Sequence, residues 1–272
     1  MFDLIKQELK QFNIELVSCL NLDECIVKRA YLLERAEISS GSVIIFAVPY
    51  LTPMSIGERT VSSYAVSKDY HLFFSSLFEK IIGKLKDTYH QNKFAGFTDH
   101  SPIDEIHAGA LAGLGVIGKN HLLITEKYSS YVFIGEIITD MPMTSHSGEL
   151  KHCLNCGKCT KACPVSADIS LCLSALTQKK AELNENEIKK IKTHGCAWGC
   201  DICQEVCPHT QSALANNTIF TEVDFFKNHL FPSLTSTQIK EMSENDFSQR
   251  AYSWRGKKTI IRNLKILEGK EC

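Results

Sequence analysis

Two dense cysteine runs constrain this chain more than any other feature. Eight of its twelve cysteines fall in Cys153-x2-Cys156-x2-Cys159-x3-Cys163-Pro164 and Cys196-x3-Cys200-x2-Cys203-x3-Cys207-Pro208. Runs at this spacing that end in Cys-Pro are typical of loops that ligate iron-sulfur clusters. Disulfide frameworks belong mainly to small secreted chains, and zinc sites seldom need a run of four cysteines. The runs therefore predict two iron-sulfur clusters and a role in electron transfer.

The spacing also predicts which thiols share a cluster. In the bacterial ferredoxin arrangement, the cysteine before the proline ligates the other cluster. The first cluster is then expected on Cys153, Cys156, Cys159 and Cys207. The second needs Cys163, Cys200, Cys203 and one more thiol, either Cys172 or Cys196, and spacing alone slightly favours Cys196. The remaining cysteines, Cys19, Cys25 and Cys272, are expected to be structural.

The distribution of cysteines indicates three regions. Residues 1–150 contain two cysteines, whereas residues 151–210 contain nine. We expect a catalytic or binding module over 1–150, a ferredoxin-like double-cluster module over 151–215, and a C-terminal helical segment over 216–272 that packs on the core. A simple ferredoxin does not need the first region, so this region is expected to hold whatever the electrons reduce.

Helical and strand patterns alternate in the first region, which predicts an α/β or α+β fold. The helices are expected at 2–12, 23–35, 70–89 and 102–111. The strands are expected at 42–48, 94–98, 121–125 and 131–139. For the helix at 102–111, Ser101 is the expected N-cap, with Pro102 in the first helical position.

Charge and hydropathy argue against several classes of partner. The chain has 30 Lys and Arg against 31 Asp and Glu, a net charge of -1, so no overall basic field attracts DNA or an anionic membrane. Any RNA contact must come from a local patch. The longest strongly apolar stretch, 43–48, is far shorter than the roughly 18 residues that span a bilayer. The charged N-terminus lacks the features of a secretory signal, so a cytoplasmic location is expected.

One stretch outside the cysteines suggests a reactive site. Asp99 precedes the expected helix at 102–111, where its carboxyl group can face a cavity as a proton donor or simply form a turn. The glycines of the following segment, 113–120, match neither a dinucleotide fingerprint nor a Walker loop. They are suited to close approach of the backbone to a flat ligand.

These motifs together resemble those of the epoxyqueuosine reductases. The resemblance rests on Asp99, on GLGVIGKN at 113–120, on GEIITD at 135–140, on the strings CLNCGKCTKACP and GCDICQEVCP, and on Asp69-Tyr70-His71. It covers roughly residues 40 to 265. Proteins of that family are cobalamin-dependent enzymes with two 4Fe-4S clusters, and they reduce the epoxide of epoxyqueuosine in tRNA to queuosine.

The resemblance implies roles for individual residues. Asp99 becomes the proton donor to the departing oxygen, and an external donor supplies single electrons through the clusters. Cys172, in a string like the family's Cys-Ile-Ser-Tyr-Leu-Thr, becomes the fourth ligand of the second cluster in place of Cys196. The implied cobalamin contacts are Tyr64, Asp69, Tyr70, His71, Lys119, Asn120, Ser129, Ser130 and Tyr131.

The chain also departs from the family pattern. Ser63, Val66 and Lys68 stand where the family has arginines, and His209 replaces the usual tryptophan after the last Cys-Pro. The chain is expected to be a short form without the C-terminal helical-repeat domain. Two alternatives therefore stay open: a related corrinoid and iron-sulfur reductase of a small molecule, as in dehalogenases, and a plain electron-transfer protein.

Overall fold

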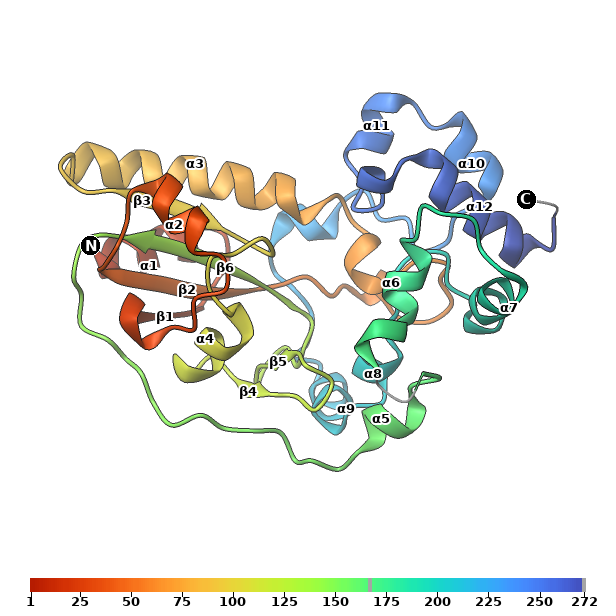
Figure 1. The fold of residues 1–272 in the computed structure, drawn as a ribbon, viewed down its shortest axis with the longest axis horizontal. Coiled ribbons are helices and arrows are strands. Elements are labelled where there is room, and N and C mark those ends of the chain that lie inside the picture. Colours follow the sequence, from red (N-terminus) through yellow and green to blue (C-terminus); the bar gives the residue numbers. More distant parts are fainter. Residues whose placement is uncertain (166–167, 271–272) are drawn as a thin grey trace. The chain divides into compact units, whose positions relative to one another are not determined.

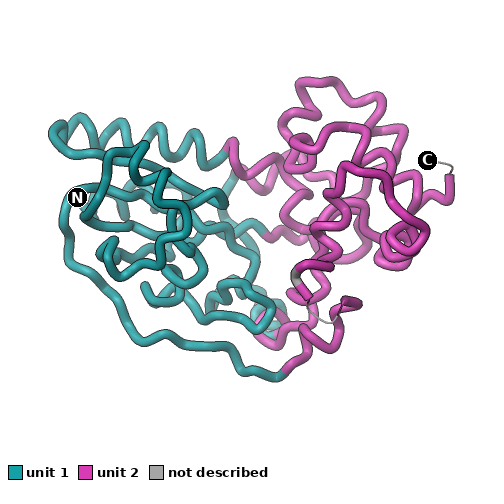
Figure 2. Tube along the Cα trace, in the orientation of Figure 1, with its two compact units in different colours: residues 1–50, 73–156, 212–224 teal, residues 51–72, 157–211, 225–272 magenta. Residues whose placement is uncertain are grey.

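The computed structural model describes residues 1–165 and 168–270, and it divides into two compact units (Figure 2). Unit 1 comprises Met1–Tyr50, Phe73–Cys156 and Ser212–Asp224, and unit 2 comprises the remaining segments. The boundary between them falls inside the first cysteine run, after Cys156. The expected division of the chain at residues 150 and 215 stays a prediction, and Cys272 lies outside the described residues.

Unit 1 is built on a four-stranded sheet with the order β1-β2-β6-β3 (Figure 1). The strands are β1 (Leu16–Asn21), β2 (Ser42–Pro49), β6 (Val132–Thr139) and β3 (Phe94–Phe97). Every neighbouring pair is antiparallel, so the unit combines helices with an antiparallel sheet. A short hairpin of β4 (Val116–Ile117) and β5 (Leu123–Ile124) lies outside this sheet. The expected mixed fold of helices and strands is confirmed.

Helices cover both faces of the sheet in unit 1. They are α1 (Phe2–Lys10), α2 (Ala30–Ala36), α4 (Glu105–Leu111) and α3 (Tyr70–Thr88), of which the part from Phe73 on belongs to unit 1. Successive side chains of a strand point to opposite faces. All eight residues of β2 are buried, because both faces of the sheet are covered. Val43 and Ile45 belong to the core that includes residues of α2 and α4. Phe46 faces α3 instead, and its ring is stacked 6.2 Å from that of Phe74.

The expected elements and the observed ones differ at several helix starts. The helix predicted at 70–89 is α3, but the helix predicted at 23–35 is wrong, because only Ala30–Ala36 is α-helical. Ser101 is not the N-cap of α4; the carboxylate of Asp104 accepts the N–H of His107 at 3.1 Å, and the Ser101 hydroxyl bonds to Glu136 instead. Strand β1 was not predicted.

None of the described helices combines the length and hydrophobicity needed to cross a membrane.

Unit 2 is mainly helical. Its helices are α5 (Lys158–Ala162), α6 (Leu173–Thr177), α7 (Glu185–His194), α8 (Ile202–Glu205), α10 (Ser236–Glu241), α11 (Glu244–Ser248) and α12 (Lys257–Glu268), while α9 (Pro208–Ala215) crosses the boundary between the units. Trp198 and Tyr252 are fully buried at the centre of its core. Helix α12 packs against α6, α7 and α10, so the C-terminal segment is part of this core.

Candidate functional site

The two cysteine runs supply helices that pack together in unit 2. Helix α5 of the first run carries Cys159, and it packs against α8, which carries Cys203. Within the described residues, every cysteine is a free thiol. Free thiols are the chemical form that can become thiolate ligands of a cluster.

The pKa of the Cys200 thiol depends on its burial and on the groups around it. Burial, together with smaller contributions from Cys203, Asp201 and Cys172, raises its pKa to about 12. Among the described residues, no three His, Cys, Asp or Glu side chains are arranged closely enough to hold a metal ion, so the ligand set of the second cluster stays a prediction. Burial disfavours the free thiolate, which a bound metal would stabilise by compensating its charge.

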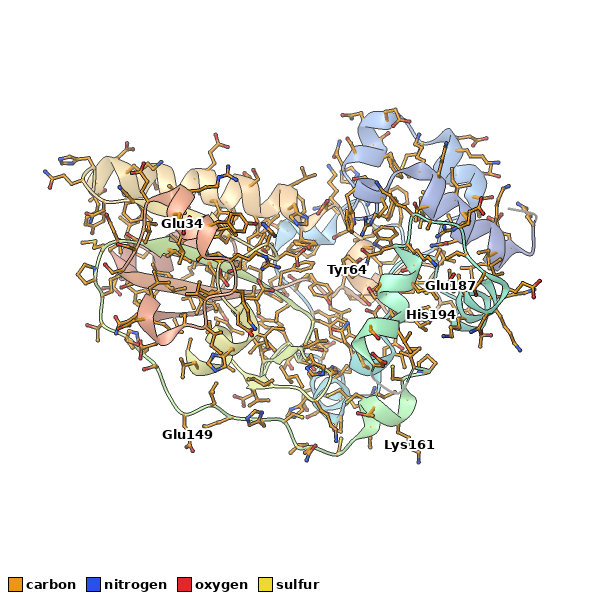
Figure 3. All side chains as sticks on the ribbon, viewed as in Figure 1. Glu34, Tyr64, Glu149, Lys161, Glu187 and His194 are labelled. Atoms are coloured by element: carbon orange, nitrogen blue, oxygen red, sulfur yellow. The ribbon has the colours of Figure 1, made fainter. Side chains whose placement is uncertain are left out.

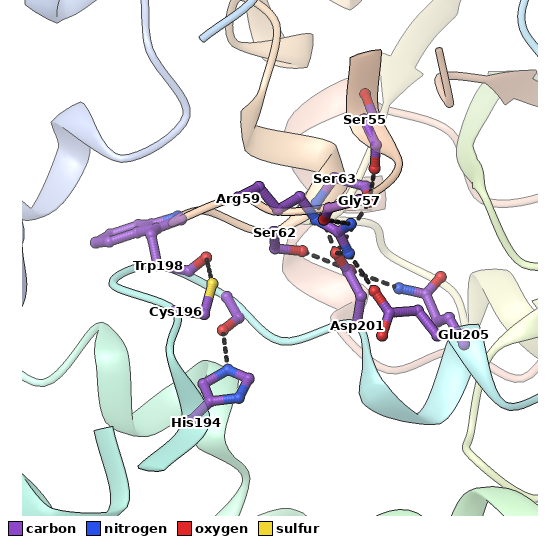
Figure 4. Close-up of polar contacts among 12 residues, drawn as sticks. Ser55, Gly57, Arg59, Ser62, Ser63, His194, Cys196, Trp198, Asp201 and Glu205 are labelled. Atoms are coloured by element: carbon purple, nitrogen blue, oxygen red, sulfur yellow. Dashed lines mark hydrogen bonds and ion pairs between the residues drawn. The ribbon is translucent and has the colours of Figure 1, made fainter. Parts of the chain in front are cut away.

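Cys196 is in a different environment. Its thiol is buried and donates a hydrogen bond to the carbonyl oxygen of Trp198 at 3.2 Å (Figure 4). Burial raises its pKa to about 12, against smaller opposing effects of the Trp198 carbonyl and Arg59. The geometry is that of a structural thiol.

Asp201, next to Cys200, is the centre of a buried polar network (Figure 4). Its carboxylate accepts hydrogen bonds from the Arg59 guanidinium at 2.8 Å, from the Ser62 hydroxyl at 2.6 Å and from the Ser63 N–H at 2.7 Å. Arg59 also forms an ion pair with Glu205. Since Asp201 lies between two cysteines of the second run, the network ties the segment 59–63 to that run.

The segment that carries Tyr64 is anchored further by backbone contacts. The N–H of Ser62 donates to the carbonyl of Trp198 at 2.7 Å, and the N–H of Ala197 donates to Thr60 at 2.7 Å. Tyr64, labelled in Figure 3, lies on the 3₁₀ helix that follows these contacts. The second cysteine run therefore determines where the backbone of Tyr64 lies.

Asp69, Tyr70 and His71 form the start of α3. The carboxylate of Asp69 accepts the N–H of His71 at 3.0 Å, the pattern of an N-cap, and it also contacts the His71 ring nitrogen at 2.8 Å. The Tyr70 and His71 rings are stacked at 4.1 Å. Capping accounts for Asp69 by itself, so a contact of these residues with a cofactor stays a prediction.

In unit 1, the start of the first cysteine run lies beside the hairpin formed by β4 and β5. The N–H of Cys153 donates to the carbonyl of Ile117 at 3.0 Å, and the N–H of Ile117 donates to Lys151 at 3.0 Å. The N–H of Lys119 points at the Cys153 sulfur at 3.4 Å. Backbone amides directed at cysteine sulfurs are among the interactions that tune iron-sulfur clusters.

The loop of this hairpin, 118–122, holds an unsatisfied side chain. Both amide atoms of Asn120 are buried, and neither has a hydrogen-bond partner among the described residues. Buried polar groups usually have partners, so this one suits a bound polar group. Gly118 permits the loop, because a Cβ there would meet the Asn120 amide oxygen and approach Ile124 Cδ1 to 2.9 Å. The polar donors Lys119 and Asn120 thus lie in the same loop that contacts Cys153.

Ser129, Ser130 and Tyr131 form a buried turn of unit 1. Their exposed fractions are 0%, 5% and 3%. Ser129 has a φ of 51°, and its carbonyl accepts the N–H of Thr125 at 2.9 Å, which closes the turn. Burial places these side chains inside the unit, and their contact with a cofactor stays a prediction.

Asp99 lies on an exposed loop between β3 and α4. Its φ of 63° is in the left-handed region, which Asp adopts more readily than most residues. Its N–H donates to the Glu105 carboxylate at 3.2 Å. The next residue, His100, bonds through its ring to the Tyr31 hydroxyl at 2.7 Å. Local hydrogen bonds therefore hold Asp99 at the surface of unit 1, where a substrate can reach it.

Two further carboxyl groups lie behind Asp99. Glu136 on β6 is fully buried and contacts the Ser101 hydroxyl, and its Oε1 has no partner among the described residues. Burial, together with the charge of Glu105, raises the pKa of Glu136 well above its usual value. Burial, together with the charge of Asp99, raises the pKa of Glu105 to about 7. Shifts of this size, caused by burial and like charges, are common at functional sites.

Comparisons with known proteins agree with this arrangement. Residues 152–210 match the family model of the 4Fe-4S double cluster binding domain. An epoxyqueuosine reductase from Synechocystis sp. is 31% identical over 224 residues, which cover 78% of this chain and 76% of that protein. The chain belongs to the epoxyqueuosine reductase family. A second epoxyqueuosine reductase, from Gloeobacter violaceus, is 29% identical over 218 residues, 76% of this chain and 68% of that protein.

Solved structures of epoxyqueuosine reductases share the fold. The enzyme from Streptococcus thermophilus has a TM-score of 0.77 at 24% identity, covering 97% of this chain and 79% of its own. An epoxyqueuosine reductase bound to a tRNA-Tyr stem loop also has a TM-score of 0.77, at 22% identity, covering 98% and 80%. The resemblance inferred from the sequence is confirmed, as is the double-cluster domain.

Several residues of this epoxyqueuosine reductase relative were not singled out from the sequence. Arg59, Asp201 and Glu105 gain their importance from burial or from their contacts, and Glu136 had appeared only as part of the GEIITD motif. Asn263 of α12 is similar: its buried amide donates to the carbonyls of Thr177 at 2.6 Å and Ala197 at 2.9 Å. For Glu136 the sequence offered two signals, its place in the GEIITD motif and its charge inside a strand pattern.

Proposed function

We propose that the chain is an oxidoreductase that reduces the epoxide of epoxyqueuosine in tRNA to queuosine. Family membership supports this proposal. The main supporting observation is the contact between the Lys119 N–H, in the hairpin loop, and the Cys153 sulfur. This contact and Asp99 lie in the same unit, so an expected cluster ligand and the expected acid belong to one unit. A cluster ligand, a loop with unsatisfied polar groups and an exposed carboxyl group are the components that an electron-fed reductase needs.

The proposed cluster ligands follow the crossed arrangement. Cys153, Cys156, Cys159 and Cys207 hold the first cluster, and Cys163, Cys172, Cys200 and Cys203 hold the second. The family resemblance supports Cys172, and the hydrogen bond from Cys196 to Trp198 supports a structural role for Cys196.

The residues present fit a bound cobalamin. The unsatisfied amide of Asn120 can bond a corrin side chain, and Lys119 in the same loop adds a second donor. We propose Tyr64, Asp69, Tyr70, His71, Ser129, Ser130 and Tyr131 as further contacts. When bound, the corrinoid supplies the redox chemistry at cobalt, which is the cofactor's own.

Asp99 is the proposed proton donor to the oxygen that leaves the epoxide. An alkoxide leaves poorly until it is protonated, so a positioned acid accelerates this step. Reduction of the epoxide to the alkene consumes two electrons and two protons and releases water. An external single-electron donor supplies the electrons, and Asp99 delivers a proton where the C–O bond breaks.

Anaerobic reconstitution tests this function. The protein is loaded with iron, sulfide and cobalamin, reduced, and incubated with tRNA that carries epoxyqueuosine. We expect queuosine in the tRNA by mass spectrometry. A protein that binds and reduces cobalamin but leaves the tRNA unchanged would point to a small-molecule substrate. A protein that binds no corrinoid would contradict both kinds of reductase.

Binding of cobalamin is tested separately with Asn120→Ala. We expect weaker binding in equilibrium titrations followed by the visible spectrum, with unchanged iron content. Asn92→Ala is the matched control, because Asn92 lies in unit 1 and bonds to Asp140 at 3.1 Å, away from the hairpin loop. Equal affinities of the two variants would exclude Asn120 from the cofactor site.

A further inference from the structure

Asp99 and His100 form the exposed tip of the loop that joins β3 to α4. The residues on either side are withdrawn from water, since Thr98 is half-buried and Ser101 is buried. The N–H of His100 donates to the carbonyl of Thr98 at 2.6 Å, which makes the tip a tight turn. Asp99 has a φ of 63°, in the left-handed region that is unfavourable for a residue with a Cβ. The place of the Asp99 carboxyl group therefore depends on how firmly Thr98 and Ser101 are held.

Both sides of this tip are fixed to strand β6. The Thr98 hydroxyl donates to the carbonyl of Ile134 at 2.8 Å. The Ser101 hydroxyl donates to Oε2 of Glu136, two residues farther along the same strand. Phe97, at the end of β3, is the residue that pairs with Glu136 in the sheet. Glu136 therefore lies beside both the start and the end of the loop that carries Asp99.

The contact between Glu136 and Ser101 is withdrawn from solvent. Glu136 is 0% exposed and Ser101 is 1% exposed. The Ser101 hydroxyl also accepts the N–H of Ile103 at 3.1 Å, so it serves as donor and acceptor at once. Oε1 of Glu136 has no hydrogen-bond partner among the residues that the structure describes. Ser101 is therefore the group that the Glu136 carboxyl holds.

A glutamate at this place in β6 does not serve the packing of the strand. Its neighbours Ile134, Ile137 and Ile138 are buried apolar residues, and an apolar side chain would fit the same surroundings. Burial of a carboxyl group is unfavourable for its charged form, and it raises the pKa of Glu136 well above its usual value. The polar group is therefore explained by what it contacts, which is the loop.

We propose that Glu136 is a positioning residue that holds the Ser101 hydroxyl and thereby fixes the loop on which Asp99 faces the substrate. The inference rests on the proposed function of Asp99 as the proton donor. Glu136 lies beneath the loop and acts through Ser101, without contact with the substrate. A displacement of a reacting group by about 1 Å can slow a reaction on the order of 100-fold, so the fixed loop matters for the rate of the chemical step.

The test compares Glu136→Met, Glu136→Gln and Thr139→Val in the cluster- and cobalamin-loaded protein. Methionine has about the length of glutamate but lacks its oxygens, whereas glutamine keeps an oxygen that can accept the Ser101 hydroxyl. Thr139→Val is the matched control. Thr139 is a buried polar residue of the same strand, but its hydroxyl accepts the N–H of Met141 at 3.2 Å and does not contact the loop.

We expect Glu136→Met to lower the single-turnover rate on tRNA that carries epoxyqueuosine by about 10- to 100-fold. Affinity for the tRNA, iron content and cobalamin content should stay unchanged, because the loop is displaced and the rest of the protein is not. Glu136→Gln should recover most of the lost rate, since it restores the acceptor for Ser101. Thr139→Val should react like the wild type.

Hydrogen exchange followed by mass spectrometry gives a readout that does not depend on activity. The segment 98–103 should exchange about tenfold faster in Glu136→Met than in the wild type, while segments of unit 2 should not change. Ser101→Ala removes the same contact from the side of the loop. Adding Glu136→Met to Ser101→Ala should therefore have little further effect on exchange or on rate.

Four results would overturn the inference: wild-type exchange of segment 98–103 in Glu136→Met, a wild-type rate in that variant, a Glu136→Gln variant that is equally slow, or additive losses in the double variant. If Glu136→Met does not fold, Ser101→Ala carries the same expectations for rate and exchange. A wild-type enzyme without turnover would instead overturn the proposed function, and hydrogen exchange would still decide whether Glu136 holds the loop.

Discussion

Arg59 and Asp201, which are 142 residues apart in the chain, form an ion pair at 2.8 Å inside unit 2. The exposed fractions of their side chains are 12% and 2%. Removing one partner of such a pair leaves the other charge buried and uncompensated, which costs about 3–5 kcal/mol. The pair therefore holds the segment before Tyr64 against the second cysteine run.

We predict that Asp201→Asn lowers the free energy of unfolding of unit 2 by about 3 kcal/mol, because Arg59 loses its buried partner. Urea unfolding of the cluster-loaded protein, followed under anaerobic conditions, measures this. Glu205→Gln is the control: Glu205 contacts the same guanidinium but is 48% exposed, so its loss should cost ~1 kcal/mol or less. Similar losses in both variants would show that burial of the pair is unimportant.

For the second cluster, we predict that Cys172→Ala lowers the iron content by about half, since one of two 4Fe-4S clusters loses a ligand. Cys196→Ala should keep its iron, because this thiol bonds to Trp198 in place of a cluster. Iron and sulfide analysis after anaerobic reconstitution distinguishes the two. Loss of iron in Cys196→Ala alone would reassign the fourth ligand.

At the reactive loop, we predict that Asp99→Asn lowers the turnover of epoxyqueuosine tRNA by about 10² to 10⁴ fold, the usual contribution of a general acid. Iron content and cobalamin binding should stay unchanged, because Asp99 lies on an exposed loop outside the cysteine runs. Asp87→Asn, on the exposed face of α3, should behave like the wild type. Wild-type turnover in Asp99→Asn would remove Asp99 from the mechanism.

The buried carboxyl groups predict a pH dependence of stability. Burial raises the folded-state pKa of Glu105 from 4.5 to about 7, so the folded protein binds more protons than the unfolded chain between these values. Stability should therefore fall as the pH rises from about 4.5 to about 7, by roughly 3 kcal/mol at 1.36 kcal/mol per pKa unit. Glu136 contributes in the same direction.

Urea unfolding at a series of pH values measures this dependence. Glu105→Gln cannot ionise, so its curve should be flatter than that of the wild type over the same interval. Parallel curves for the two proteins would show that Glu105 titrates normally in the folded state.

Two glycines should respond oppositely to alanine. A Cβ at Gly135 would collide with the ring of Phe74 and lie 2.6 Å from that of Phe46, so we predict that Gly135→Ala lowers the free energy of unfolding by about 1–3 kcal/mol. Gly83 lies within α3 with open space around its Cα, and Gly83→Ala should raise stability by about 0.5–1 kcal/mol. Thermal unfolding of both variants measures the contrast, and stabilisation by Gly135→Ala would mean that the rings move freely.

The amino-acid sequence determined those features of this protein that depend on local spacing. The cysteine runs specify the double-cluster domain, because a loop that wraps a cluster needs thiols a few residues apart. The apolar stripe of α3 and the β-branched run of β2 likewise specify a helix and a buried strand, because their periods match those of the regular structures. The family motifs, including Asp99, were also visible in the sequence.

The tertiary structure alone decided which distant groups meet and which are withdrawn from water. It brings Arg59 to Asp201, buries Glu136 beside Ser101, and gives the N-cap of α4 to Asp104. None of these follows from spacing, because burial and Coulomb interactions depend on packing between segments far apart in the chain. For the same reason, the hydrogen bond between Cys196 and Trp198 became visible only when the chain was folded.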